Sequence, residues 1–326
     1  MAPSTTEQAK ISEREALTSR VLPKMVLSAG DQASMTGPPV PAPPYLNAEG
    51  RARLRFAVEG NAMYIVNPPI AKEKTDWSRV TGGAGTLGFE AARALLEHGL
   101  AGLMIFDVNP AQAQEKIDEL AAEFPAAKIK SKKVDITDDV AVNEAVVETA
   151  QLLGSIDILL CFAGVVGCTH AIAMTAAEWR RTLDINTTGS FLCAQAAAKQ
   201  MIAQESGGSI VFTASISGHR VNYPQPQIAY NVSKAALLTL KNSLAAEWAR
   251  YGIRVNSISP GYMDTILNEG QGIAEARAVW AERNPMGRMG TPSELTGAVV
   301  LLSSNAGTYM NGKTLFPKSE SYLILT

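Results

Sequence analysis

Tyr230 and Lys234, in the stretch Tyr230-Asn231-Val232-Ser233-Lys234, are the residues whose types and spacing could do chemistry. On a helix, side chains four positions apart share one face, so the ammonium can lie beside the phenol. Free tyrosine has a pKa of about 10, and a neighbouring cation favours the phenolate. The pair is a candidate acid/base for proton transfer, but the spacing alone is also typical of an amphipathic surface pair.

Further candidates lie upstream of Tyr230. Ser215 lies fifteen residues before it, at the end of the apolar run Ile210–Ala214, and Asn186 lies further back. Apolar strands that end in polar residues place those residues at the carboxyl edge of a sheet, where ligands bind in open α/β folds. A serine at a strand end can also be a simple turn residue.

A glycine-rich stretch, Thr81-Gly82-Gly83-Ala84-Gly85-Thr86-Leu87-Gly88, precedes a helix expected over Leu87–His98. Such a loop lets the backbone approach a pyrophosphate at the helix N-terminus, although a plain glycine turn fits the same residues. Asp107, about twenty residues further, ends the next strand and can accept hydrogen bonds from both hydroxyls of an adenosine ribose. Its carboxylate would repel a 2′-phosphate. No Arg or Lys follows Asp107 directly or lies in the loop, so NAD is favoured over NADP.

The elements that must position these residues alternate between strand and helix. This alternation predicts an α/β fold with a doubly wound parallel sheet of the Rossmann kind. The expected strands are 103–106, 128–134, 156–162, 208–213 and 254–259, and the expected helices are 111–123, 140–153, 176–204 with an interruption before Asn186, 229–251 and 273–283. Asp135 follows the strand expected over 128–134, where its carboxylate can cap an adenine or form a turn.

Composition favours a globular protein that handles small molecules. Of 326 residues, 46% are hydrophobic and 18% charged, which is ample for one large core. A formal charge of -2 and no long basic run give no reason to expect nucleic acid or an anionic membrane as a partner. Cys161, Cys168 and Cys193 lack metal-ligand spacing, so no metal is predicted. Without an apolar stretch of about 18 residues or a secretory signal, a cytoplasmic location is expected.

The two ends of the chain differ from its middle. Residues 1–50 are polar and contain Gly37-Pro38-Pro39-Val40-Pro41-Ala42-Pro43-Pro44, which forbids a helix and predicts a disordered spacer. The catalytic domain is expected over 51–316, followed by an atypical C-terminal tail at 317–326.

With these residues in place, the chain from about Arg51 to Phe316 resembles the short-chain dehydrogenase/reductase family. The matching features are the glycine-rich loop, Asp107, Asp135-Ile136, Ala163-Gly164, Asn186, Ser215, Tyr230 with Lys234, and Pro260-Gly261. The segment Gly218–Gln227, together with Ser259-Pro260-Gly261-Tyr262, is similar to fungal reductases of polyols and ketoses such as mannitol, sorbitol, arabinitol and xylulose.

The resemblance implies a role for each matching position. Tyr230 would exchange the proton of the substrate hydroxyl, and Ser215 would orient the substrate oxygen. Lys234 would bind the nicotinamide ribose and, with the positive nicotinamide ring, lower the pKa of Tyr230. Asn186 would hold a water that links Lys234 to solvent. The cofactor-binding residues implied by the family are Gly82, Thr86, Leu87, Gly88, Asp107, Asp135, Ile136, Ala163, Gly164, Tyr230, Lys234, Pro260 and Thr265.

Several positions depart from the family pattern. Thr86 replaces the usual middle glycine of the loop, and its hydroxyl can bond to phosphates or its bulk can weaken binding. Phe162 stands where the family has an asparagine, so a hydrogen bond between strands is expected to be missing. Leu315-Phe316-Pro317-Lys318-Ser319 replaces a Val-Asp-Gly-Gly motif, which puts the last strand in question. Ser217 is a rival to Ser215, since its spacing from Tyr230 is more usual in the family.

The largest departure is an atypical insertion at 64–79. The residues just before the glycine-rich loop, Lys72 to Arg79, are too polar for a central strand. Deleting Tyr64 to Arg79 would join Met63 to Val80 and restore an apolar strand, so we interpret the segment as translation of a retained intron. A GT donor could open at the last base of the Met63 codon, and an AG acceptor could close within the Arg79 codon.

One alternative to the intron hypothesis follows from the same residues. The segment can be a natural surface insertion, in which case Met63 to Val66 takes the strand's place. Sequencing the transcript tests the hypothesis, because a mature message that contains the segment in every read would contradict it.

The sequence therefore predicts an NAD-preferring dehydrogenase of a secondary alcohol in a polyol or the matching ketose. Two alternatives stay open: a relative that binds nucleotide without turnover, and a reductase of 3-oxoacyl or steroid ketones. The alanine-rich helices 176–204 and 229–251 favour a homo-oligomer, a tetramer or dimer as the resemblance implies.

Overall fold

Parallel strands form a single sheet in the computed structural model, which describes residues 61–65, 86–222, 225–265 and 274–317. The strand order is β3-β2-β1-β4-β5-β6-β7. The strands are β1 (Asn61–Ile65), β2 (Gly102–Asp107), β3 (Lys128–Lys133), β4 (Ile158–Cys161), β5 (Gly208–Thr213), β6 (Ile253–Ile258) and β7 (Thr314–Leu315). The chain order reverses between β1 and β4, which opens a ligand crevice at the carboxyl ends of the strands. The predicted doubly wound sheet is confirmed.

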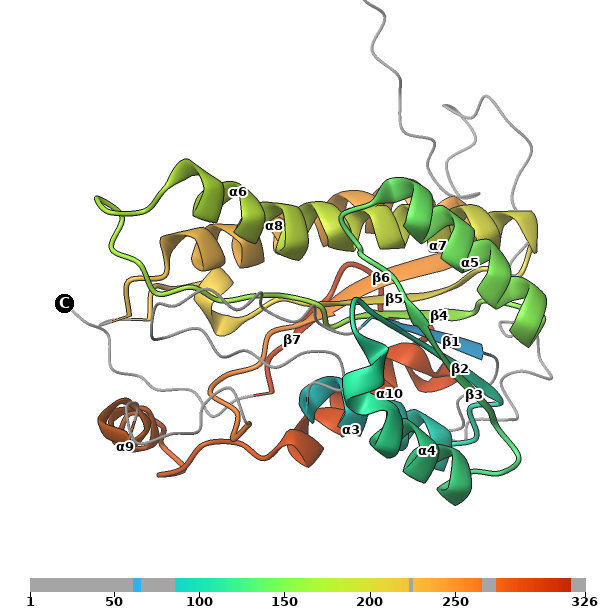
Figure 1. Ribbon diagram of the computed structural model, residues 1–326, viewed down its shortest axis with the longest axis horizontal. Coiled ribbons are helices and arrows are strands. Elements are labelled where there is room, and N and C mark those ends of the chain that lie inside the picture. The colour runs from blue at the N-terminus through green and yellow to red at the C-terminus, as the bar shows by residue number, and fades with distance from the viewer. Residues whose placement is uncertain (1–60, 66–85, 223–224, 266–273, 318–326) are drawn as a thin grey trace, which may run out of the picture.

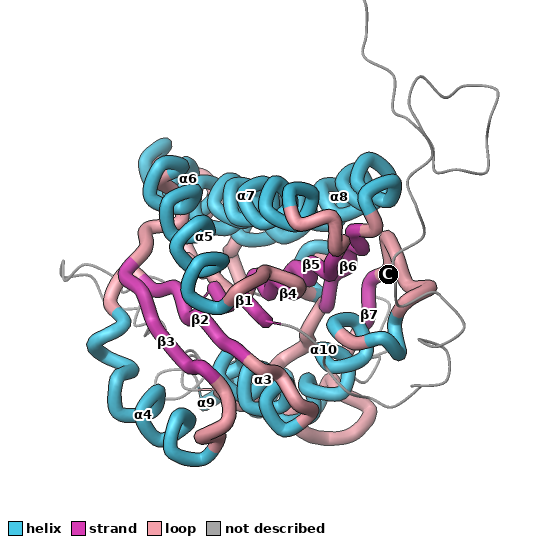
Figure 2. Tube along the Cα trace, turned by 90° about the vertical axis from the view of Figure 1, so that its right-hand side faces the viewer, coloured by secondary structure: helices cyan, strands magenta, loops and turns pink. Residues whose placement is uncertain are grey.

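Helices cover both faces of the sheet (Figure 1). They are α3 (Thr86–Glu97), α4 (Gln114–Glu123), α5 (Asp139–Leu153), α6 (Ala176–Leu183), α7 (Ser190–Ala203), α8 (Ile228–Trp248), α9 (Ala274–Glu282) and α10 (Thr296–Ser303). The helices α5 to α8 pack on one face, and α3, α4 and α10 pack on the other (Figure 2). Within the described ranges, no helix is long and apolar enough to cross a membrane.

Alternation along the strands divides the core into two layers. Leu103 and Ile105 of β2 pack with α3 and α4, whereas Met104 and Phe106 pack with α5 and α7. Successive side chains of a strand point to opposite faces, so a strand covered on both sides must be apolar throughout. For this reason, continuous apolar runs in the sequence predict the positions of the inner strands.

The helix expected over 176–204 continues through Asn186 instead of breaking before it. Residues Asp184–Gly189 form a π-helical turn, η4, between α6 and α7, and the residues at both junctions keep right-handed helical angles. A π turn adds one residue to the helical repeat and rotates the following side chains. The predicted interruption is therefore a local widening of the helix at Asn186.

The first and last strands form despite the sequence departures. Tyr64 and Ile65 lie in β1, where they pair with Ile105 and Phe106 of β2 and with Leu160 and Cys161 of β4. This arrangement corresponds to the alternative in which residues from Met63 onward supply the strand. Residues 66–79 and the loop with Gly82 lie outside the described residues. At the other end, Thr314 and Leu315 pair with Ser257 and Ile258 of β6.

Candidate active site

Tyr230 lies in the first turn of α8 and forms a hydrogen bond with Ser215, which follows β5. Burial raises the pKa of Tyr230, and the weaker effect of the Ser215 hydrogen bond lowers it. The effect that the resemblance implies for Lys234 together with the positive nicotinamide ring stays a prediction. Desolvation of the phenolate outweighs the local stabilisation. The hydrogen bond between Ser215 and Tyr230 brings the two hydroxyl groups close enough to contact the same substrate oxygen.

Lys234 lies one turn after Tyr230 and is 4% exposed. Its Nζ donates a hydrogen bond to the backbone oxygen of Thr213 at 2.6 Å and lies 5.7 Å from the centroid of the Tyr230 ring. Burial lowers the pKa of Lys234 to about 8, and the nearby Cys161 opposes this change. Because about 8 is still above neutral pH, most of the population carries the ammonium at pH 7. The predicted proximity of cation and phenol is present.

Asn186 is fully buried, and its side chain ties the π turn to two neighbouring elements. Its Oδ1 accepts a hydrogen bond from the Val165 backbone at 2.7 Å. Its Nδ2 donates to the Val165 oxygen and to Ser233 Oγ, each at 2.9 Å. Ser233 immediately precedes Lys234, so Asn186 positions the stretch of α8 that carries the lysine. The water relay implied for Asn186 stays a prediction.

Ser217, the rival of Ser215, is held by other side chains. Its hydroxyl oxygen accepts hydrogen bonds from Asn222 Nδ2 at 2.7 Å and from Gln227 Nε2 at 3.2 Å. Gln227 also donates to Asn231 Oδ1 at 3.1 Å. This network was not predicted from the sequence, because its members are joined only when the loop after β5 folds onto α8. It fixes the loop and leaves Ser215 as the serine that contacts Tyr230.

Gly218 lies where that loop meets α8. A Cβ added to Gly218 would lie 2.7 Å from the Lys234 carbonyl carbon and 2.9 Å from the Ala235 nitrogen. Backbone atoms of a packed helix cannot yield without moving the helix. The close approach therefore requires glycine at this position.

The Gly218→Ala variant is expected to lose about 1–3 kcal/mol of unfolding free energy, because α8 must shift to admit the new methyl group. Displacing Tyr230 and Lys234 should also lower kcat by about 10-fold or more. Gly167→Ala is the matched control, since a Cβ there meets nothing within 4 Å. Thermal unfolding and turnover of both variants provide the measurement. Equal stability of the two variants would show that the contact at Gly218 is unimportant.

Asp107 is a buried carboxylate at the end of β2. It is 1% exposed, and its Oδ1 accepts a hydrogen bond from the Asn109 backbone at 2.6 Å. Its Oδ2 is buried without a hydrogen-bond partner. Burial raises the pKa of Asp107 to about 6, although the Asn109 bond lowers it. A buried acceptor without a partner fits a ligand that brings hydroxyl donors, such as the adenosine ribose of a dinucleotide.

The stability of the cofactor-free protein should fall as pH rises from about 4 to about 6, because Asp107 then ionises in the folded state. The raised pKa means that the folded protein holds this proton longer than the unfolded chain, so the contribution is present at low pH and lost above about 6. The loss amounts to about 1–3 kcal/mol. Urea unfolding of wild type and Asp107→Asn at pH 4.5 and pH 7 measures it. Parallel pH dependences in the two proteins would rule out Asp107 as the cause.

The other predicted cofactor residues lie along the carboxyl edge of the sheet or close to it. Thr86, Leu87 and Gly88 begin α3, whose first turn has no acidic residue. This helix end therefore suits an anion. Asp135 is exposed, and its Oδ1 accepts hydrogen bonds from the Thr137 backbone and hydroxyl at 2.9 and 2.7 Å. The turn alternative for Asp135 is thus observed. The remaining predicted residues follow neighbouring strands and are Ile136, Ala163, Gly164, Pro260 and Thr265.

Residues 162 and 164 after β4 pack close to the site. Gly164 matches the family pattern and lies beside Lys234, because a Cβ there would lie 3.2 Å from Asn186 Oδ1 and 3.3 Å from Lys234 Nζ. Phe162, two residues earlier, packs against the core layer of α3 and α10. The aromatic side chain therefore contributes apolar contacts where the family has an amide.

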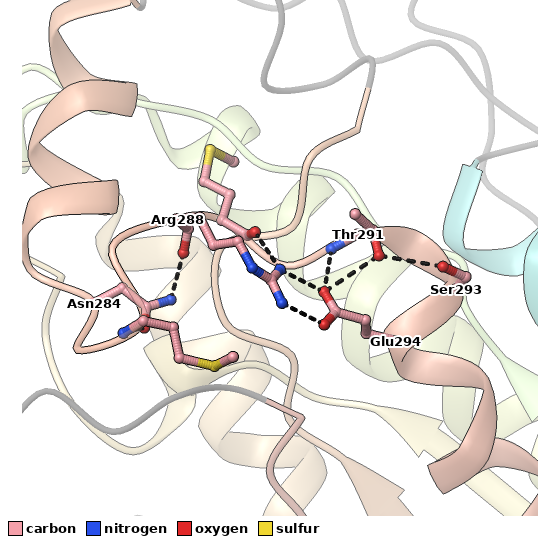
Figure 3. Close-up of polar contacts among 7 residues, drawn as sticks. Asn284, Arg288, Thr291, Ser293 and Glu294 are labelled. Carbon is pink, nitrogen blue, oxygen red and sulfur yellow. Dashed lines mark hydrogen bonds and ion pairs between the residues drawn. The ribbon is translucent and has the colours of Figure 1, made fainter.

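A charged segment after α9 supports the loop that follows β6 (Figure 3). Arg288 donates to both carboxylate oxygens of Glu294 at 2.6 and 2.7 Å, and Asn284 Nδ2 donates to the Arg288 oxygen at 2.6 Å. Gly290 pairs with the loop after β6 through the Tyr262 oxygen and the Asp264 nitrogen. The segment therefore holds Tyr262 in place.

A hollow of about 600 Å³ lies against this segment, lined by residues that include Asp264, Arg277, Arg288 and Glu294. Neither Ser215 nor Tyr230 lines it, so we do not assign it to catalysis. Among the residues that the structure describes, no cluster of His, Cys, Asp and Glu could hold a metal ion.

The doubly wound sheet carries a buried acid, Asp107, at the end of β2. It also brings together Ser215, Tyr230 and Lys234 beyond β5. This combination of fold and site is typical of a nucleotide-binding oxidoreductase.

Comparison with known proteins gives the same class. A family model described as enoyl-(acyl carrier protein) reductase matches residues 82–317. The sorbose reductase of Candida albicans is 35% identical over 238 residues, which cover 72% of this chain and 83% of the relative. The NADP-dependent mannitol dehydrogenase of Hypocrea jecorina is 37% identical over 235 residues, covering 72% and 87%.

A solved structure shares the fold. The crystal structure of a short-chain type dehydrogenase/reductase from Mycobacterium marinum has a TM-score of 0.71 and 33% identity, covering 82% of this chain and 98% of that one. The chain belongs to the short-chain dehydrogenase/reductase family. It is an NAD(P)-dependent dehydrogenase that acts on CH–OH groups.

Proposed function

We propose that the protein is an NAD-preferring dehydrogenase that interconverts a secondary alcohol of a polyol and the matching ketose. The observation that carries the proposal is the hydrogen bond between Ser215 and Tyr230, with the Lys234 ammonium 5.7 Å from the tyrosine ring. This arrangement lies at the carboxyl edge of the sheet, beside the expected nucleotide crevice. Tyr230 supplies an acid/base and Ser215 supplies a donor that orients the substrate oxygen, and the oxidation of an alcohol uses both groups.

The chain's own residues handle the proton in this proposal. In the oxidative direction the phenolate of Tyr230 takes the hydroxyl proton, and Ser215 donates a hydrogen bond to the substrate oxygen. The protonated Lys234 stabilises the phenolate and binds the nicotinamide ribose. Asn186 holds the Ser233 hydroxyl next to Lys234 and binds the relay water. When bound, NAD+ supplies the hydride acceptor, so the alcohol becomes a ketone and one proton is released.

The preference for NAD rests on Asp107. Its unpartnered Oδ2 suits a ribose hydroxyl, and above about pH 6 its negative charge disfavours a 2′-phosphate. The mannitol dehydrogenase of Hypocrea jecorina is NADP-dependent by its name, so the cofactor preference has to be measured on this chain. We expect a higher kcat/KM with NAD+ than with NADP+, and a smaller ratio in Asp107→Ser. A wild-type preference for NADP+ would reject the cofactor proposal while leaving the dehydrogenase intact.

The substrate class is supported by the sequence around the site. The loop Gly218–Gln227 and the Pro260-Gly261-Tyr262 segment resemble polyol reductases, and the named relatives act on sorbose and mannitol by their printed names. An acyl substrate is the second candidate, since the matching family model is described as an enoyl-(acyl carrier protein) reductase.

Initial rates with purified protein test the proposal. The panel contains hexitols, pentitols, their ketoses, a 3-oxoacyl thioester, an enoyl thioester and a steroid ketone, each with NAD(H) and with NADP(H). We expect the highest kcat/KM with a polyol or ketose. A higher value with a thioester or steroid would reject the polyol assignment. NADH binding without turnover of any substrate would favour the alternative of a disabled nucleotide-binding relative.

We also propose a cytoplasmic homo-oligomer, in line with the alanine-rich helices α7 and α8. Ile228 and Val232 lie one turn apart on α8 and are 42% and 41% exposed, so this helix has apolar side chains available for a second copy. Sedimentation velocity should give a dimer or tetramer mass. A monomer at micromolar concentration would contradict this part of the proposal.

A further inference from the structure

Tyr262 joins three separate parts of the chain next to the candidate active site. It follows β6, and its hydroxyl donates a hydrogen bond to Gln225 Oε1 at 2.7 Å in the loop before α8. Its ring stacks on Trp280 of α9, with ring centroids 4.3 Å apart and planes 8° apart. The loop after β5, the loop after β6 and α9 therefore meet at one aromatic ring.

This ring lies close to the reacting tyrosine. The loop that carries Ser215 is joined to the segment before Tyr262, because the Ile216 backbone N–H donates to the Pro260 oxygen at 3.2 Å. The pKa of Tyr262 is raised to about 12, mainly by burial; Arg283 lowers it, and Tyr230 and Cys168 raise it. Tyr262 is a neutral phenol at neutral pH and remains a hydrogen-bond donor. It is only partly buried, so part of its surface is open to a ligand.

Trp280 brings an unused donor to the same place. Its side chain is 6% exposed, and its Nε1 is buried without a hydrogen-bond partner. A buried N–H group without a partner is costly, so native structures usually provide one from a ligand, a water or another side chain. Stacked aromatic rings also offer rigid apolar surface at low entropic cost.

We propose that Gln225, Tyr262 and Trp280 form the substrate-selecting wall of the pocket, and that this wall recognises the hydroxyl groups of a polyol beyond the carbon that reacts. The inference rests on the proposed function and extends it to the choice of substrate. Gln225 supplies an amide whose acceptor is already oriented by Tyr262. Gln225 Nε2 and Trp280 Nε1 can donate, and the Tyr262 hydroxyl oxygen can accept, so the three residues match the donors and acceptors of a hydroxylated chain. An alcohol with a single hydroxyl group reaches only Ser215 and Tyr230.

Two conservative variants separate recognition from folding. Tyr262→Phe keeps the stacked ring and removes the hydroxyl group, and Gln225→Met keeps the length of the side chain and removes its amide. The matched control is Tyr309→Phe, because Tyr309 is fully exposed. KM and kcat are measured for a hexitol and for cyclohexanol, together with the dissociation constant of NADH from fluorescence.

Each wall variant should raise KM for the hexitol by about 3- to 10-fold, the effect of losing one hydrogen bond to a ligand. The kcat, the NADH dissociation constant and the cyclohexanol kinetics should stay within about 2-fold of wild type, as should all values for Tyr309→Phe. Equal losses with the hexitol and cyclohexanol, or an unchanged hexitol KM, would overturn the inference.

A binding measurement distinguishes failure of the wall from failure of the proposed function. If the wild-type protein oxidises no alcohol, the hexitol is titrated into its NADH complex and tryptophan fluorescence is followed. A saturable change whose dissociation constant rises in Tyr262→Phe and in Gln225→Met would uphold the wall and reject only the dehydrogenase reaction. No change in the wild-type protein would overturn the wall itself.

Discussion

Replacing Tyr230 with Phe is expected to lower kcat by about 10²- to 10⁴-fold, because the variant loses its acid/base. The phenol is the group that contacts Ser215, and no other described tyrosine has this contact. The ring remains, so its contact with the Lys234 ammonium at 5.7 Å is retained. NADH binding should therefore change by less than about 3-fold, which is the measurement that separates chemistry from cofactor affinity.

A second tyrosine provides the control for this prediction. Tyr251→Phe removes a hydroxyl at the end of α8, in the 3-10 turn after the helix, and should leave kcat unchanged. Retention of more than a tenth of the wild-type kcat in Tyr230→Phe would mean that another group exchanges the proton. In that case Ser215 would be the first residue to test.

Deleting residues 64–79 should tighten NADH binding by about 10-fold. Twenty residues now separate the end of β1 at Ile65 from the start of α3 at Thr86. After the deletion, Val80 and Thr81 take the positions of Tyr64 and Ile65 beside β2 and β4, and only four residues remain before α3. Shortening a loop fivefold lowers its closure cost by about 1.4 kcal/mol, which corresponds to about 10-fold in affinity for a ligand that orders it.

The control is a variant in which residues 66–79 are replaced by the same number of Gly and Ser residues. Its β1 sequence and linker length are unchanged, so its NADH affinity should stay near wild type. Both variants are compared by fluorescence titration and by thermal unfolding. Weaker NADH binding after the deletion, in a protein that is still folded, would show that the segment belongs to the functional chain.

The matched part of the chain begins after the segment that we interpret as an insertion. The family model begins its match at residue 82, whereas β1, a central strand of the sheet, lies before that residue in the sequence. The relatives named above also align with about 235 to 238 residues only. The central strand is therefore supplied by residues outside the matched region, which is the physical situation that an insertion just before the glycine-rich loop would produce.

Much of the fold could be predicted from apolar periodicity. The strand expected over 208–213 has those bounds, and the helix expected over 229–251 corresponds to α8 and the turn that follows it. These elements are long or buried on both faces, so their patterns leave few alternatives. Asp107 was predicted from its place after a buried strand, and its burial follows from that place.

Features that depend on contacts between distant residues could not be predicted. The π turn at Asn186 coincides with side-chain bonds to Val165 and Ser233, and its local sequence is that of an ordinary helix. The raised pKa of Tyr230 results from burial, which the local spacing of tyrosine and lysine does not reveal. The contact of Tyr262 with Trp280 joins residues eighteen positions apart across two elements.

Transfer of deuterium is the measurement that tests the central claim most directly. The protein is incubated with NAD+ and a hexitol deuterated at its secondary carbinol carbons, and the nicotinamide product is analysed by mass spectrometry. The account predicts NADH that carries one deuterium and a ketose product, with both formed at least about 10²-fold more slowly by Tyr230→Phe. Unlabelled NADH, or no NADH from a wild-type protein that binds the cofactor, would contradict hydride transfer from a polyol.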